Sequence, residues 1–254
     1  MSEYLGVVET TVFIEDGRRY LSNIADIDIG FGNRLLAELN ELQEPESPSA
    51  SKALINFCAR EPKQKLFKHS EQDPKQFLRK LRQKARSKDD FSKKNDLPIV
   101  YFHRLPGISF NDDGSEIVVK TVGHISDETG VIANVDEIPC SISYQVYVLS
   151  WDEVSLNKIA ASLMASGLIG QRNFTYKTVV LNSVLDGDAV VAPAQLSSWE
   201  DASISAEEDR LLVLSSVFSM KAPIYQARGV TSKTLTIAIN PPVPFYANSD
   251  LGGN

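Results

Sequence analysis

Residues 139–166 constrain the fold more than any other stretch, because the period of the apolar residues changes within it from two to 3.6. Alternate residues of its first part are apolar and predict a strand with one buried face: Ile142, Tyr144, Val146 and Val148. Beyond Trp151 the apolar residues recur at helical spacing: Leu156, Ile159, Ala160, Leu163 and Met164. Either Ser150 or Asp152 can cap this helix. We therefore expect an α+β fold, in which a mostly antiparallel sheet carries a long helix, about 152–166, on one face.

The N-terminal residues predict a β-hairpin that precedes the first helix. Apolar and polar residues alternate over 8–14, residues 15–17 supply a turn that contains glycine, and 20–29 run back as the second strand. We interpret Gly30-Phe31-Gly32 as the turn into a helix. A dinucleotide-binding loop would need a third glycine where Leu35 stands, so that alternative is not favoured.

The chain is expected to have three parts. Residues 1–96 hold the hairpin, the added helices and a basic segment, 97–240 form the main α+β domain, and 241–254 form an extended tail. The helices expected in the first part are 34–42, 51–60 and 74–87. The strands expected in the second part are 99–102, 116–122, 139–150, 176–184, 189–196, 211–220 and 233–239.

Charge is segregated along the chain, whose net charge is −7. Residues 60–94 carry thirteen basic and five acidic side chains, whereas the flanking parts are acidic. On the helix expected at 74–87, the apolar stripe leaves four basic side chains outward as candidate partner-binding residues: Lys75, Arg79, Arg82 and Arg86. This face can be merely solvated, can contact nucleic-acid phosphates, or can dock an acidic protein surface. Because few aromatic residues accompany the charges, we favour protein over nucleic acid.

The sequence carries no common catalytic or metal-binding motif. The two cysteines, Cys58 and Cys140, and the three histidines do not have zinc-site spacing, and no nucleophile elbow or phosphate-binding loop is present. His103 with Asp112 or Asp113 would be an acid–base pair without a nucleophile beside it. Asp186-Gly187-Asp188 lacks the spacing of a calcium loop and is interpreted as a turn. We therefore expect a protein that is not an enzyme and needs no cofactor, metal or small-molecule substrate.

The composition is that of an ordinary globular protein, with 43% hydrophobic and 23% charged residues. No apolar run is long enough to span a membrane, and the N-terminus does not resemble a signal peptide. Together with the low cysteine content, this predicts folding in a reducing, intracellular compartment and no membrane contact.

Several segments, taken in order, resemble a known family. The first is an early strand with its turn (97–102 and 108–110). The next is a proline-led strand with tyrosines (138–148) and the helix after it. A later strand with an acidic loop (189–201) and a closing strand (208–225) follow. Over about residues 97–228 the chain resembles the tail terminator or tail-sheath completion proteins of contractile-tailed bacteriophages.

The resemblance implies a virion structural protein that is assembled in the host cytoplasm. Such a protein forms a ring, commonly a hexamer, that ends the tail tube and sheath and joins them to the neck. Its expected partners are copies of itself, the tube and sheath proteins, and the neck or connector proteins. The alternatives are another ring or wedge component of the neck or baseplate, a nucleic-acid-binding accessory protein that uses the basic segment, and an enzyme with a site assembled from distant residues.

Overall fold

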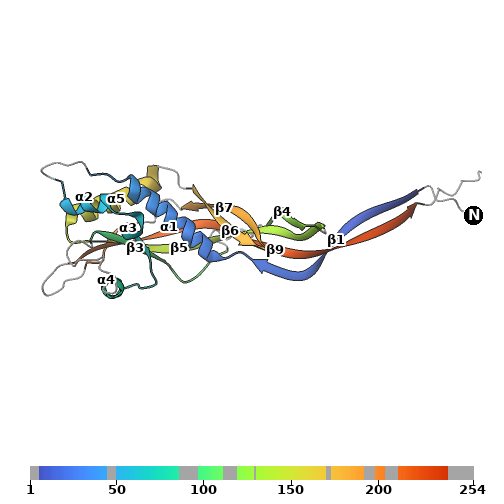
Figure 1. Ribbon diagram of the computed structural model, residues 1–254, viewed down its shortest axis with the longest axis horizontal. Helices are drawn as coiled ribbons and strands as arrows, with labels where there is room; N and C mark the ends of the chain where they lie inside the picture. The colour runs from blue at the N-terminus through green and yellow to red at the C-terminus, as the bar shows by residue number, and fades with distance from the viewer. Residues whose placement is uncertain are drawn as a thin grey trace, which may run out of the picture.

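The computed structural model describes residues 6–44, 50–85, 97–110, 119–128, 130–169, 173–191, 198–203 and 211–239. The fold is α+β and mostly antiparallel, as predicted, and its body is drawn out at one end into a long two-stranded ribbon (Figure 1). The expected tail at 241–254 lies outside the described residues.

Two long strands form the backbone of the sheet. β5 (Gly130–Ser150) pairs antiparallel with β9 (Leu212–Ile239) along its length, from Ala133↔Gly229 to Ser150↔Leu212. Beyond β5 lie β3 (Ile99–Arg104) and then the short parallel β2 (Leu66–Lys68), and beyond β9 lie β7 (Ser183–Val191) and β6 (Asn173–Val180). β4 (Lys120–Asp127) pairs with β5, and β8 (Glu200–Asp201) pairs with β9. Strands from both expected parts, 1–96 and 97–240, therefore belong to one sheet.

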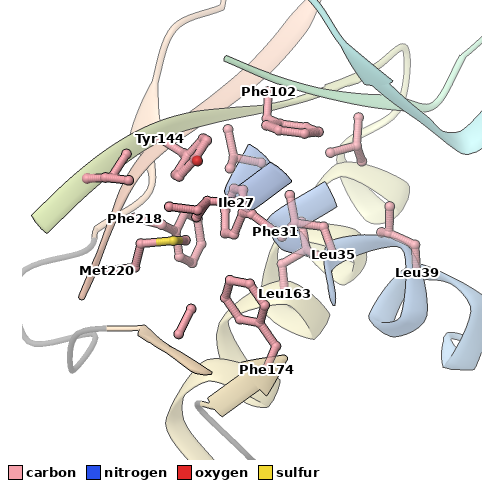
Figure 2. Close-up of a cluster of buried hydrophobic side chains, with 14 of the residues drawn as sticks. Ile27, Phe31, Leu35, Leu39, Phe102, Tyr144, Leu163, Phe174, Phe218 and Met220 are labelled. Atoms are coloured by element: carbon pink, nitrogen blue, oxygen red, sulfur yellow. The ribbon is translucent and has the colours of Figure 1, made fainter. Parts of the chain in front are cut away.

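One face of the sheet is covered by α1 (Ile24–Glu41) and α5 (Glu153–Ile169), with α2 (Lys52–Ala59) beside them (Figure 1). The alternating residues predicted for the strand, including Tyr144 and Val146, are buried under these helices. Phe31 of α1 stacks on Tyr144 with ring centroids 4.4 Å apart. The Phe102 ring contacts Phe31 edge-on, with centroids 5.4 Å apart (Figure 2). The predicted helix is therefore confirmed, together with the face of the strand on which it packs.

The opposite face is covered at one end by α4 (Pro74–Ala85). Here the other alternation of the strands is buried, so that Tyr101 of β3 stacks on Phe77 of α4 at 4.1 Å and on Tyr147 of β5 at 4.6 Å. A short helix, α3 (Pro62–Lys65), leads from α2 into β2. Strands β3, β5 and β9 are thus buried on both faces near this end of the molecule.

The expected N-terminal hairpin is wrong. β1 (Gly6–Leu21) continues through the predicted turn and pairs antiparallel with β9, from Gly6↔Ile239 to Leu21↔Gln226. The Asp16-Gly17 sequence forms an irregularity within β1, where Gly17 has φ +82° and the Asp16 carboxylate accepts hydrogen bonds from Arg18. The local turn signal therefore marks a bulge, because the long-range partner strand β9 extends the pairing on both sides of it.

The first helix begins at Ile24, about ten residues before the predicted start, and Asn23 caps it through the backbone N–H of Ala25 at 2.9 Å. Gly30 and Gly32 consequently lie inside α1 rather than in a turn before it. A Cβ on Gly30 would lie 2.6 Å from Cβ of Tyr176 on β6, and one on Gly32 would lie 3.0 Å from the Phe102 ring. The glycines thus allow α1 to pack closely on the sheet.

Candidate docking surfaces

The outer face of α4 carries Lys75 and Arg79, two of the four candidate partner-binding residues predicted from the sequence. Asp73 caps the helix, because its carboxylate accepts the backbone N–H of Lys75 at 2.9 Å and its carbonyl accepts that of Phe77. Phe77 and Leu78 are buried against the sheet, as predicted. Lys75 and Arg79 are exposed, and Lys80 is exposed and forms an ion pair with Glu71. We call Lys75, Arg79 and Lys80 the basic face.

Arg82 and Arg86 do not belong to the basic face as described. Arg82 is half-buried, and its Nε is buried with no hydrogen-bond partner among the described residues. The reason is helical geometry: Arg82 follows Leu78 by four residues and lies at the margin of the apolar stripe. Arg82 is therefore only partly exposed, and Arg86 lies outside the described residues.

Other cations of the basic segment hold the fold together. The Arg60 guanidinium donates to the carbonyls of Pro98 (2.8 Å) and Leu97 (3.1 Å). Lys65 is buried, donates to Asn40 Oδ1 at 3.1 Å, and has a pKa lowered by burial. The charge excess in the sequence therefore overstates the basic surface that is available to a partner, because net charge does not distinguish buried cations from exposed ones.

A buried carboxylate joins α1 to three strands. Asp28 accepts the Tyr144 hydroxyl at 2.6 Å and Lys68 Nζ at 2.8 Å, and Arg104 Nη1 lies 3.3 Å from it. Burial and the hydrogen bond to Asp28 raise the pKa of Tyr144 well above its ordinary value, so the Tyr144 hydroxyl remains a donor. The site is saturated by partners within the chain, so we interpret it as a structural link between helix and sheet.

A second buried carboxylate lies where the ribbon leaves the body. Asp136 of β5 accepts both Nε (2.5 Å) and Nη2 (3.1 Å) of Arg228 on β9, and the Thr121 hydroxyl of β4 at 2.7 Å. Arg228 also pairs with Glu15 of β1. Burial alone would raise the pKa of Asp136, but the hydrogen bonds from Arg228 and Thr121 lower it below its ordinary value. Four strands are therefore tied together at the base of the ribbon.

The ribbon itself is the segment in which β1 and β9 pair with each other beyond this base, from Glu15↔Val230 to Gly6↔Ile239. In Figure 1 it projects away from the helices and from the rest of the sheet. At its base, apolar side chains of β1 and of the adjoining end of α1 are exposed, and they include Ile14, Leu21 and Ile29. A two-stranded ribbon leaves main-chain hydrogen-bonding groups free on its outer edges and is marginally stable alone.

A hollow of about 340 Å³ opens at the start of α5. The half-buried Leu212 and Leu214 line it from β9, and Trp151, Glu153 and Asp201 are exposed residues on its wall. Asp201 lies on β8, and its carboxylate also accepts the backbone N–H of Ser203 at 2.8 Å. The other lining residues are Leu156, Asn157 and Ser203. We call this feature the Trp151 hollow; sequence reasoning did not find it, because its two carboxylates are about fifty residues apart.

Of the two groups of aspartates considered in the sequence, one lies in a strand and the other lies outside the described residues. Asp186-Gly187-Asp188 lies within β7, not in a turn, and Gly187 leaves room for the Tyr176 ring, which a Cβ there would approach to 2.4 Å. Asp112 and Asp113, the alternative partners of His103, lie outside the described residues.

Among the residues that the structure describes, no group of His, Cys, Asp and Glu is arranged to hold a metal ion, and no helix is long and apolar enough to cross a bilayer.

Comparison with known proteins adds no relative: no family model matches the chain, and no curated protein is significantly similar to it.

Proposed function

We propose that this protein is a structural component of a virion, which assembles into a ring, with six copies expected, and terminates or completes a contractile bacteriophage tail. In this role it joins the tail tube and sheath to the neck. The observation that carries the proposal is the projecting ribbon, because a long two-stranded element that extends away from the rest of the described residues is suited to bind a neighbouring subunit through the outer edges of its strands.

The order of the family-like segments agrees with this role. The early strand is β3, the proline-led strand and its helix are β5 and α5, and the closing strand is the first half of β9. These elements belong to the body from which the ribbon extends. A station in the neck or baseplate would use the same features, so the experiment must report where in the particle the protein acts.

The test is removal of the protein from a phage that encodes it. We expect separated heads and tails, or tails of uncontrolled length, when particles are inspected by electron microscopy. A second variant, Ile14→Asp, places a charge on an exposed apolar residue at the base of the ribbon and is expected to reproduce the defect without unfolding the protein. Normal infectious particles that lack the protein would refute the proposal, and defective baseplates with intact necks would move it to the alternative station.

One observation favours nucleic-acid binding as a second candidate, namely the exposed cations of the basic face. Phosphate contacts of this kind weaken steeply as salt rises. Tight, salt-sensitive binding of duplex DNA by the purified protein, lost in Arg79→Glu, would support that function. We expect instead no such binding.

A further inference from the structure

The basic face and the Trp151 hollow lie on opposite faces of the sheet. Phe77 of α4 packs on the face that bears the buried rings of Tyr101 and Tyr147, whereas the hollow is lined by Leu212 and Leu214, which pack with the core under α1 and α5. Figure 1 shows α4 on one side of the sheet and α5 on the other. A single copy therefore cannot bring its own basic face to its own hollow.

The two surfaces are complementary in chemistry. The hollow offers two carboxylates, from Glu153 and Asp201, beside the exposed indole of Trp151. Such a site accepts a guanidinium, because the carboxylates neutralise its charge and the aromatic face attracts a cation. The basic face offers the exposed Arg79, with the exposed Lys75 four residues before it and therefore beside it on the surface of α4.

We propose that the basic face of one copy docks on the Trp151 hollow of a second copy, with Arg79 entering the hollow. The contact is heterologous, since different surfaces of the two copies meet, and its repetition gives a closed ring or an open filament. This inference rests on the proposed function and names one interface of the ring. A second copy is the chosen occupant because the opposite charges occur on separate faces of the same chain.

The experiment compares self-association of the full-length protein with that of charge-reversed variants, by light scattering and sedimentation at about 50 mM and about 500 mM salt. Arg79→Glu and Glu153→Arg are each expected to raise the apparent dissociation constant at low salt by about tenfold or more. The effect should shrink at high salt. Controls with the same charge changes on other exposed positions, Lys177→Glu on β6 and Asp188→Arg on β7, should leave association unchanged.

A mixture of the two variants gives a sharper result. Each alone has like charges at the contact, but in an alternating assembly every contact pairs opposite charges again. We therefore expect the equimolar mixture of Arg79→Glu and Glu153→Arg to associate nearly as well as the unaltered protein. If Glu153→Arg does not fold, Glu153→Gln combined with Asp201→Asn removes both charges and keeps an acceptor for the Ser203 N–H.

The outcomes separate this interface from the proposed function. Unaltered association in the single variants, or no rescue in the mixture, would overturn the interface, and the particle defect on removal of the protein would still support the tail function. A protein that stays monomeric at every concentration would overturn self-docking. Loss of association in both variants, with rescue on mixing, would establish the contact even if the protein acts elsewhere in the tail.

Discussion

Arg228 holds the carboxylate of Asp136 through two of its nitrogens at the point where β9 leaves the body for the ribbon. The Asp136 side chain is only 4% exposed, and the same guanidinium reaches Glu15 of β1. This arrangement compensates a buried charge with the cation that also fixes the direction of the ribbon. Removal of the cation would leave the buried carboxylate unpaired, which costs more than the net contribution of the pair.

We predict that Arg228→Met lowers the free energy of unfolding by about 3 kcal/mol, measured with chemical denaturant at neutral pH. The double variant with Asp136→Asn should recover part of this loss, because no buried charge then remains. Arg18→Met, at an exposed ion pair with Asp16, is the control and should change stability far less, because solvent screens this pair. Equal losses of unfolding free energy in Arg228→Met and Arg18→Met would show that the buried Asp136 carboxylate does not need Arg228 for the stability of the fold.

The core beneath α5 gives a second prediction. Leu163 is 2% exposed and packs among side chains of the sheet and of α1 (Figure 2). Leu163→Ala should lower the free energy of unfolding by about 2–5 kcal/mol, because it removes buried methyl groups and leaves a cavity. Val154→Ala on the exposed side of the same helix is the control, with an expected change below about 0.5 kcal/mol. A loss below about half a kcal/mol for Leu163→Ala would contradict the burial of this face.

The elements predicted correctly are those whose signal is local. The helix after Trp151 was found because its apolar period is uninterrupted and Asp152 caps it, accepting the Ser155 N–H at 2.8 Å. The first turns of α1 were assigned to a strand because Ile27 and Ile29 alternate with acidic residues. Asp28 is buried there only because Lys68, Arg104 and Tyr144 reach it from three distant strands, and no local pattern carries that information.

The candidate docking surfaces also divide into those with a local sequence signal and those without one. Lys75 and Arg79 were found from the helical stripe, whereas the ribbon needs the pairing of β1 with β9, about two hundred residues later in the chain. The hairpin was predicted in its place because a glycine with positive φ serves a bulge as well as a turn. The Trp151 hollow likewise combines the start of α5 with β8 and β9.

Close helix–sheet packing predicts an unusual response to alanine. Gly30 lies within α1, where alanine is normally more favourable than glycine by about 1 kcal/mol. Here a Cβ would lie 2.6 Å from the Tyr176 Cβ and 3.0 Å from the Phe174 ring, so the helix must shift from β6. Gly30→Ala should therefore lower the free energy of unfolding by about 1–3 kcal/mol. Asn33→Ala, at an exposed position of the same helix, should be neutral or slightly stabilising, and a stabilising Gly30→Ala would refute the close approach.

The last prediction concerns His103, which is 5% exposed and lies beside the Tyr147 ring at 5.8 Å. Neither ring nitrogen has a hydrogen-bond partner among the described residues, and burial lowers the pKa of His103.

The pH dependence of stability follows from this lowered pKa. In the unfolded chain the His103 ring binds a proton near the ordinary histidine pKa of about 6.5, whereas in the folded protein it binds the proton only at lower pH. Stability contributed by the neutral ring is full above about pH 6.5 and is lost as pH falls towards the lowered value. Between about pH 7.5 and about pH 5.5 we expect the unaltered protein to lose more of its unfolding free energy than His103→Leu does. Parallel pH profiles for the unaltered protein and His103→Leu would mean that the ring is protonated as readily in the folded protein as in the unfolded chain.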